Sequence, residues 1–246
     1  YKFDSTIARL QVRTGIYPYH TSPSLDVSLN YNFLERYGCR YGSFQFYVFD
    51  GKTLQNWKNW LLPSGEGRYR SASPACNSPT DQRLFFEYYY HDPAYRKRAM
   101  DFMDSVKDGD YVVVTNLGWV PGPFVDASVL KSDEVTLGAG NSIYHKFKNA
   151  GFGLVDSFKN TLPMIFIYKK NDPSFTPVQH IGITNEQITE VVEIPSYYTS
   201  GNIESPWFGP SKSWKELIWK GTDREPLMPD TTSIDIIGKT SSGIEL

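Results

Sequence analysis

The chain has 246 residues, of which 40% are hydrophobic, enough for at least one domain with a substantial core. Lys and Arg together number 25, and Asp and Glu number 27. This balance argues against a nucleic-acid-binding surface, which usually carries a clustered basic excess. The sequence also has no polybasic run that would favour a membrane surface, and no apolar run near the ~18 residues that a spanning helix needs. We expect the chain to be a segment of a longer protein.

Cysteine and aromatic content bear on the cellular setting. The two cysteines, Cys39 and Cys76, are too few for a cysteine-based metal site, and we expect neither a metal nor a cofactor. A disulfide between them suits an exported protein, and two unpaired thiols suit the sequence equally. The 17 Tyr and 6 Trp residues, with loops rich in Ser, Asn, Gly and Pro, favour an extracytoplasmic location, secreted or at the cell surface.

Three stretches in the first fifth of the chain have strand character. Residues 5–16 and 25–31 alternate apolar and polar side chains, which predicts strands with one face in solvent. Residues 41–49 (YGSFQFYVF) are richer in aromatic and β-branched residues, and a turn is predicted after them at Asp50-Gly51. The long polar loop at 63–81 is typical of a partner-facing segment or of a solvated insertion.

A helix, a glycine turn and a buried strand are predicted next. Asp92 is the expected helix cap, and Pro93 is the first helical residue. Arg96 is assigned to the solvated face of this helix with the two basic residues after it. The turn KDGD then leads into YVVVT at 111–115, whose uninterrupted apolar run is typical of a strand buried on both faces.

A second helix is predicted to begin after Asn141 or Ser142 and to end at Gly151. Further strands are predicted over 154–158, 163–168 and 187–194.

Changes in residue composition and hydrophobic pattern along the chain indicate four regions. Residues 1–32 are expected to be strands of a preceding module or edge strands of the main domain, and 33–200 form the main domain. Residues 201–231 are expected to be a Trp-rich connecting segment, and 232–246 the start of a following β-module.

No catalytic motif stands out. The four histidines lie in unrelated contexts, and GxSxG, GxxxxGK[ST] and GxGxxG motifs are absent. The acids around the end of the first helix lack the spacing of a calcium loop and are ordinary in a solvated turn. These acids are Asp101, Asp104, Asp108 and Asp110. We therefore predict a protein that is not an enzyme, and a hydrolase with an unrecognised site is the least favoured alternative.

Aromatic side chains in loops are better candidates for recognition. Trp and Tyr present flat, amphipathic faces that contact ligands or partners with little loss of entropy, and they serve equally well as plugs between modules. By analogy with sheets flanked by helices, a site is expected where the strand at 111–115 ends, beside the start of the second helix. The candidate ligand-binding residues are Asn116, Trp119, Asn141, His145, Trp207, Phe208 and Trp214.

The order of elements resembles the ILEI/PANDER-like (interleukin-like EMT inducer) domain. The resemblance covers about residues 41–170 and is carried by FQFYVFDGKTL, DSVKDGDYVVVTN, SIYHKFKNAG and LPMIFIYKK. Ala150-Gly151-Phe152 stands where the family has LGS, and the family's cysteines are not evident. The runs YHTSPSLDVSL and IESPWFGPSKSWKEL are similar to multidomain surface proteins of Bacteroidota called type IX secretion sortase-like proteins. Some of those carry a gingipain-like cysteine peptidase, whose Cys/His motif is absent here.

This resemblance implies an α+β (α/β mixed) fold, with a mixed β-sheet core and two main helices, flanked by β-segments of neighbouring modules. It also implies binding and not catalysis. We predict a non-catalytic binding or interaction module of a secreted or cell-surface multidomain protein, with a glycan as its ligand. The alternative is a structural domain of a type IX secretion-associated surface complex. Its partners would be neighbouring domains of the same chain or secretion and surface proteins.

Overall fold

The computed structural model describes residues 5–19, 26–35, 42–75, 82–120 and 123–197, and the single residues 208, 209, 215, 216, 218 and 234. The chain divides into two compact units, Tyr1–Gly201 and Asn202–Leu246. All helices and strands of the described residues lie in the first unit. Both cysteines lie outside the described residues, as does nearly all of the predicted connecting segment and following β-module.

The main sheet has five strands in the order β10-β9-β8-β4-β7. They are β4 (Ser43–Phe49), β7 (Phe86–Tyr89), β8 (Tyr111–Leu117), β9 (Met164–Lys169) and β10 (Val178–Ile181). Every pairing in this sheet is antiparallel. The expected mixed sheet is therefore wrong. The helix between β7 and β8 suggests a parallel crossover, but β4 lies between these two strands and is antiparallel to both.

A second sheet has four strands in the order β11-β1-β2-β3, again all antiparallel. They are β1 (Ser5–Thr14), β2 (Asp26–Leu29), β3 (Asn32–Glu35) and β11 (Ile188–Tyr197). The strands predicted within 1–32 thus pair with a strand from the far end of the main domain and belong to the same compact unit. A separate two-stranded ladder joins β5 (Asn59–Trp60) to β6 (Gln82–Arg83).

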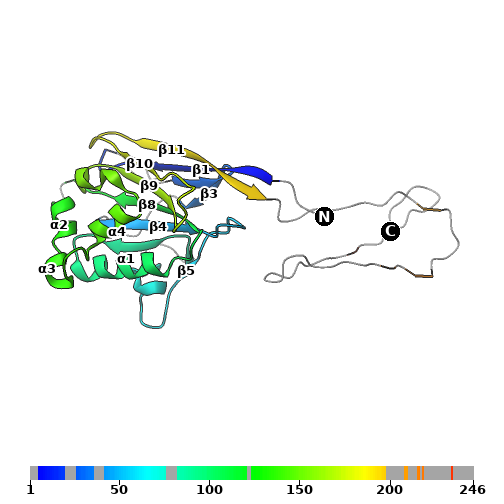
Figure 1. The fold of residues 1–246 in the computed structure, drawn as a ribbon, viewed down its shortest axis with the longest axis horizontal. Helices are drawn as coiled ribbons and strands as arrows, with labels where there is room; N and C mark the ends of the chain where they lie inside the picture. The colour runs from blue at the N-terminus through cyan, green and yellow to red at the C-terminus, as the bar shows by residue number, and fades with distance from the viewer. Residues whose placement is uncertain are drawn as a thin grey trace. The chain divides into compact units, whose positions relative to one another are not determined.

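The unit is layered, with the four-stranded sheet on one face of the main sheet and the helices on the other (Figure 1). Alternation along β4 shows why, since side chains of neighbouring residues point to opposite faces. Phe44 and Phe46 belong to the cluster under the helices, whereas Tyr47 and Phe49 belong to the cluster between the sheets. The main sheet is buried on both sides, as its apolar strands predicted.

The helices are α1 (Pro93–Ser105), α2 (Ala127–Lys131), α3 (Glu134–Leu137) and α4 (Ile143–Asn149). The predicted cap of the first helix is confirmed, because the Asp92 side chain accepts a hydrogen bond from the Ala94 amide at 2.8 Å. Ser142 caps α4 as predicted. The mixed α+β class with two main helices, α1 and α4, is confirmed, and β-structure dominates it.

Two segments differ from the predicted strands and loops. Residues 154–158 were expected to form a strand, but residues 154–157 lie in the 3-10 helix η2 (Gly153–Ser157), and Phe158 follows as its C-cap. The Val155 amide bonds back to the Phe152 carbonyl, which keeps the chain turning. The polar loop at 63–81 contains a second 3-10 helix, η1 (Arg68–Arg70).

The turn that contains Gly51, after β4, contacts the turn that contains Gly109, before β8. Gly109 has φ +85°, a conformation that glycine adopts freely. A Cβ on Gly51 would lie 2.0 Å from the Gly109 carbonyl oxygen, so the contact requires glycine at position 51. The Gly51 amide donates to the Asp110 side chain at 3.0 Å, which ties the turn after β4 to the turn before β8.

No helix among the described residues is both long enough and apolar enough to cross a membrane.

Candidate functional site

The end of β8 is buried, and its polar side chain is engaged in hydrogen bonds within the protein. Asn116 lies inside the strand, not in the loop after it, and is fully buried. Its side-chain oxygen accepts a hydrogen bond from the Met164 amide and its side-chain NH2 donates to the Leu162 carbonyl, both at 2.8 Å. Asn116 therefore fixes the start of β9, and both polar atoms of its side chain are engaged in doing so.

The other candidates of the first unit have separate local roles. Trp119 is 40% exposed and forms an isolated parallel bridge with Tyr17. The Asn141 side chain donates to the Leu137 carbonyl at 3.2 Å. His145 Nδ1 lies 2.9 Å from Ser142 Oγ in the first turn of α4. These bonds hold helix ends together, and exposed Trp119 is the candidate best placed to contact another molecule.

In the second unit, Phe208 is exposed. Trp207 and Trp214 lie outside the described residues.

The acids around the end of α1 bind different partners. Lys97 pairs with Asp101, and Lys146 Nζ lies 2.6 Å from Asp104. The Asn171 side chain donates to Asp108. Asp110 is the buried member, bonded to Gly51, and burial followed by the nearby Asp50 charge raises its pKa. In the described part of the chain, no group of three His, Cys, Asp or Glu side chains is arranged to hold a metal ion.

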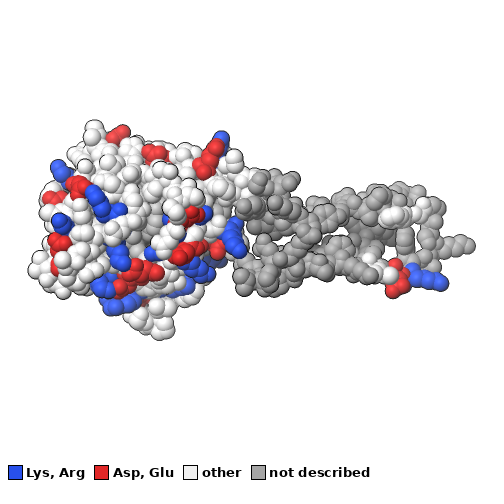
Figure 2. Space-filling view, viewed as in Figure 1, with Lys and Arg blue, Asp and Glu red and all other residues white. Residues whose placement is uncertain are grey.

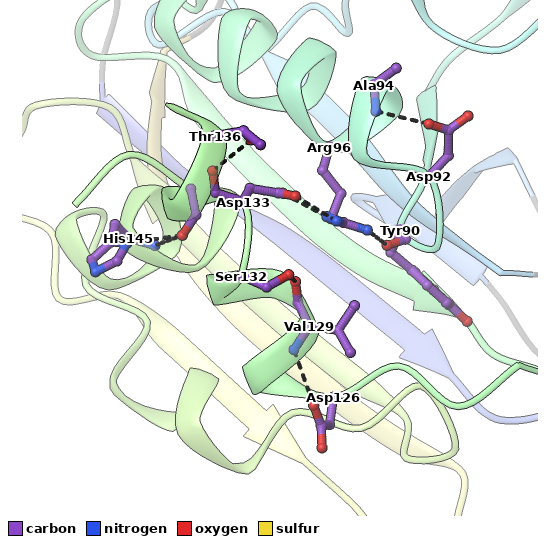
Figure 3. A network of polar contacts seen from close by, with 11 residues as sticks. Tyr90, Asp92, Ala94, Arg96, Asp126, Val129, Ser132, Asp133, Thr136 and His145 are labelled. Atoms are coloured by element: carbon purple, nitrogen blue, oxygen red, sulfur yellow. Dashed lines mark hydrogen bonds and ion pairs between the residues drawn. The ribbon is translucent and has the colours of Figure 1, made fainter. Parts of the chain in front are cut away.

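A buried ion pair lies under the helices (Figure 3). Arg96 was predicted to face solvent, which is wrong: its guanidinium binds both carboxylate oxygens of Asp133, at 2.6 and 2.7 Å, and donates to the Tyr90 carbonyl at 2.7 Å. The two side chains are 3% and 5% exposed. Because the pair is enclosed and fully hydrogen-bonded, it fastens α1 to the turn before α3 and presents nothing to a ligand.

In contrast to the buried ion pair, the outer face of the four-stranded sheet is exposed to solvent. Inward-facing residues of β1 are buried, which leaves Arg9 and Gln11 on the outside. The register places Glu193 of β11 directly beside Arg9, and it places Gln11 between Val191 and Ser28. Strand pairing thus brings residues from three distant parts of the chain onto one surface.

A hollow of about 130 Å³ lies on this face, lined by Arg9, Gln11, Ser28, Tyr31 and Val191. At ~30 Å³ for each water in the liquid, it has room for a few waters. We call these five residues and Glu193 the sheet-face site.

Tyr31 reaches this face from an unusual backbone position. Leu29 pairs with Asn32, so Asn30 and Tyr31 form a two-residue hairpin turn. Their φ angles are +50° and +65°. Such turns favour Asn followed by Gly, and a bulky residue with positive φ is a conformational outlier. The turn nevertheless carries a tyrosine that is 70% exposed, and residues in strained backbone conformations are concentrated at functional sites.

Hydrogen bonds hold the polar groups of the sheet-face site in place. Arg9 donates to the Tyr31 hydroxyl at 2.8 Å, and two of its nitrogens donate to one Glu193 oxygen at 3.1 and 3.2 Å. Bonding to Tyr31, and then to Glu193, raises the pKa of Arg9. The site therefore offers an aromatic ring, a fixed guanidinium and a carboxylate whose charges cancel. That combination suits a neutral, polar ligand with hydroxyl groups.

Sequence reasoning missed this site for an identifiable reason. The polar positions of residues 5–16 were interpreted as an ordinary wet face, and Asn30-Tyr31 lacks the glycine that marks a two-residue turn. The partner strand β11 begins more than 170 residues after Arg9 and gives no local signal. Tyrosine directly after asparagine, at the end of the alternating stretch 25–31, was the available clue.

No known family model matches the chain, and no curated protein matches it either.

Proposed function

We propose that this chain is a non-catalytic binding module whose ligand is a glycan, bound at the sheet-face site. The observation that carries the proposal is the hollow beside Tyr31, an exposed ring held in a strained turn next to a charge-neutral Arg9–Glu193 pair. Sugars present apolar ring faces and many hydroxyl groups. An exposed aromatic ring can contact the former, while arginine, carboxylate and amide groups exchange hydrogen bonds with the latter.

The setting proposed for this function is the cell surface or the extracellular medium. It is supported by the resemblance to ILEI/PANDER-like domains in surface proteins of Bacteroidota and by the aromatic-rich composition. Protease treatment of intact producing cells, followed by detection of the chain with an antibody, tests this location. Complete protection of the chain in intact cells and its loss only after lysis would contradict it.

A glycan array tests the ligand class and its location together. We expect Tyr31→Asn to abolish binding of array hits, since asparagine tolerates positive φ and removes the ring together with the hydroxyl that Arg9 binds. The matched control is Phe124→Asn, which removes another exposed aromatic ring from a different surface and should leave binding unchanged. Trp119→Ala should also bind normally.

Two results would count against the proposal. An array without any hit contradicts the glycan class and favours the structural alternative. Loss of binding in Trp119→Ala with normal binding in Tyr31→Asn would place the site at the end of β8.

A further inference from the structure

A second surface lies around the β5–β6 ladder, beside the edge of the main sheet that β7 forms. Trp60 on β5 is exposed, and the Arg68 guanidinium lies over its ring, 4.0 Å from the ring centre. Lys58, whose carbonyl accepts a hydrogen bond from Arg68, and Arg70 are also exposed. We call these four residues the arginine tip. In Figure 2, charges of both signs are mixed over the visible face of the first unit, so a local excess of one sign is informative.

Hydrogen bonds of the buried Asn59 side chain hold the backbone of the arginine tip in place. The buried Asn59 side chain accepts a hydrogen bond from the Arg68 amide at 2.8 Å and donates to Ser71 and to the Phe85 carbonyl. A Cβ on Gly67 would lie within 2.8 Å of three side-chain atoms of Asn59 and Ser71, so the loop is tightly closed. Residues 59–71 are therefore held together as an ordered structure.

Backbone strain positions the cations. Tyr69 and Arg70 both have positive φ, +54° and +57°, although neither is glycine. Tyr69 uses this conformation to place its ring against Phe86 and Phe102 in the core. The same conformation directs the chain so that Arg70 remains on the outside. Two consecutive left-handed residues are costly, so the core contacts of Tyr69 must hold this arrangement in place.

Most positive charge at the arginine tip is uncompensated. Arg98 on α1, nearby, is neutralised by Glu66 at 2.9 Å. Among the described residues, no carboxylate pairs with Lys58, Arg68 or Arg70. The Arg68 guanidinium donates to the Lys58 carbonyl at 2.7 Å and to the Tyr69 hydroxyl at 3.3 Å, which fixes its plane and leaves its other donors unused.

We propose that the arginine tip binds an anionic polysaccharide, through sulfate or carboxylate groups held by Arg68 and Arg70. Guanidinium groups match the geometry of such anions, and a fixed plane loses little entropy on binding. The exposed Trp60 ring adds an apolar surface for the adjoining sugar. This inference extends the proposed function, on which it rests for the glycan class, to a second site with a charged ligand.

Binding of dextran sulfate, with uncharged dextran as reference, tests the proposal by calorimetry at low and moderate salt. We expect dextran sulfate alone to bind, with affinity falling as salt rises. Arg70→Gln should weaken binding by about tenfold, the typical effect of one charge-assisted hydrogen bond. Arg70→Lys should recover part of the loss. Lys131→Gln, the control, removes an exposed cation from α2 and should not change affinity.

The outcomes separate this site from the sheet-face site. The Tyr31→Asn variant should bind dextran sulfate with full affinity. The Arg70→Gln variant should still bind the uncharged glycans that the parent protein binds on the array. Equal affinities of Arg70→Gln, Arg68→Gln and Lys131→Gln would overturn the proposal. So would tighter binding of poly-glutamate than of dextran sulfate, because that result would identify an acidic protein as the partner.

Discussion

Two arginine–carboxylate pairs lie in opposite surroundings in this protein. Arg96 and Asp133, under the helices, are 3% and 5% exposed, whereas Arg9 and Glu193, on the outer face of the four-stranded sheet, are 52% and 54% exposed. The buried pair uses both carboxylate oxygens and a backbone carbonyl. The exposed pair uses one carboxylate oxygen and remains open to solvent. The same chemistry thus fastens buried elements together in one region and remains accessible at the proposed binding site in the other.

The largest expected effect comes from breaking the buried pair. Asp133→Ala leaves the Arg96 charge enclosed without its partner, and we expect a loss of about 3–5 kcal/mol in the free energy of unfolding, measured by denaturant titration. In the matched variant Glu193→Ala, Arg9 stays hydrated, and the unfolding midpoint should not move.

A double substitution sharpens this comparison. Replacing Arg96 by Met and Asp133 by Leu removes both charges and keeps apolar volume, so most of the lost stability should return. A double variant as unstable as Asp133→Ala would show that packing, and not the unpaired charge, dominates the loss.

The contact between the two glycine turns should give the next largest effect. In Gly51→Ala the new methyl group would overlap the Gly109 carbonyl, and we expect a loss of about 1–3 kcal/mol, the usual range for overpacking. Gly153→Ala is the control, because its Cβ would make only ordinary contacts, at 3.6 Å or more. Similar unfolding midpoints for both variants would contradict a rigid contact between the turns.

The smallest effect concerns pH. Burial, and then the Asp50 charge, raise the pKa of Asp110, so the folded state holds this proton more tightly than the unfolded state does. Asp110 therefore makes its most favourable contribution below the ordinary Asp pKa of ~3.9, and this contribution declines as pH rises through the raised pKa. Asp110→Asn should gain stability relative to the parent between acid and neutral pH in denaturant titrations.

Asp172 provides a control of opposite sign. Hydrogen bonds from Lys169 and Ser174 lower its pKa to about 2. Its contribution is present above the ordinary Asp pKa and is lost as pH falls towards 2, so Asp172→Asn should reduce stability at neutral pH and match the parent in strong acid. If both variants changed with pH in the same direction, the assignment of opposite shifts would be wrong.

The local features of the fold could be predicted from sequence. The cap at Asp92, the cap at Ser142 and the buried strands β8 and β9 all follow from short-range patterns and are confirmed. The strand predicted at 154–158 was wrong because alternation over five residues does not distinguish a strand from a 3-10 turn packed on the core.

Long-range partnerships could not be predicted. Arg96 was assigned to solvent because its partner, Asp133, lies 37 residues away on another element. Asn116 was placed in a loop because nothing local reveals its bonds to Leu162 and Met164. The sheet-face site depends on pairing between β1 and β11, the first and last strands of the unit. In each case the missing information is which distant segment comes alongside.

The hairpin turn at Tyr31 has a consequence for how this surface can change over time. Glycine at this position would relieve the positive-φ strain, and substitutions of this kind are among the commonest routes to greater stability. A lineage that no longer needed the ring would therefore be expected to drift toward glycine or asparagine at position 31. Sequences that keep an aromatic residue in this turn despite its conformational cost would mark the relatives in which the surface is still in use.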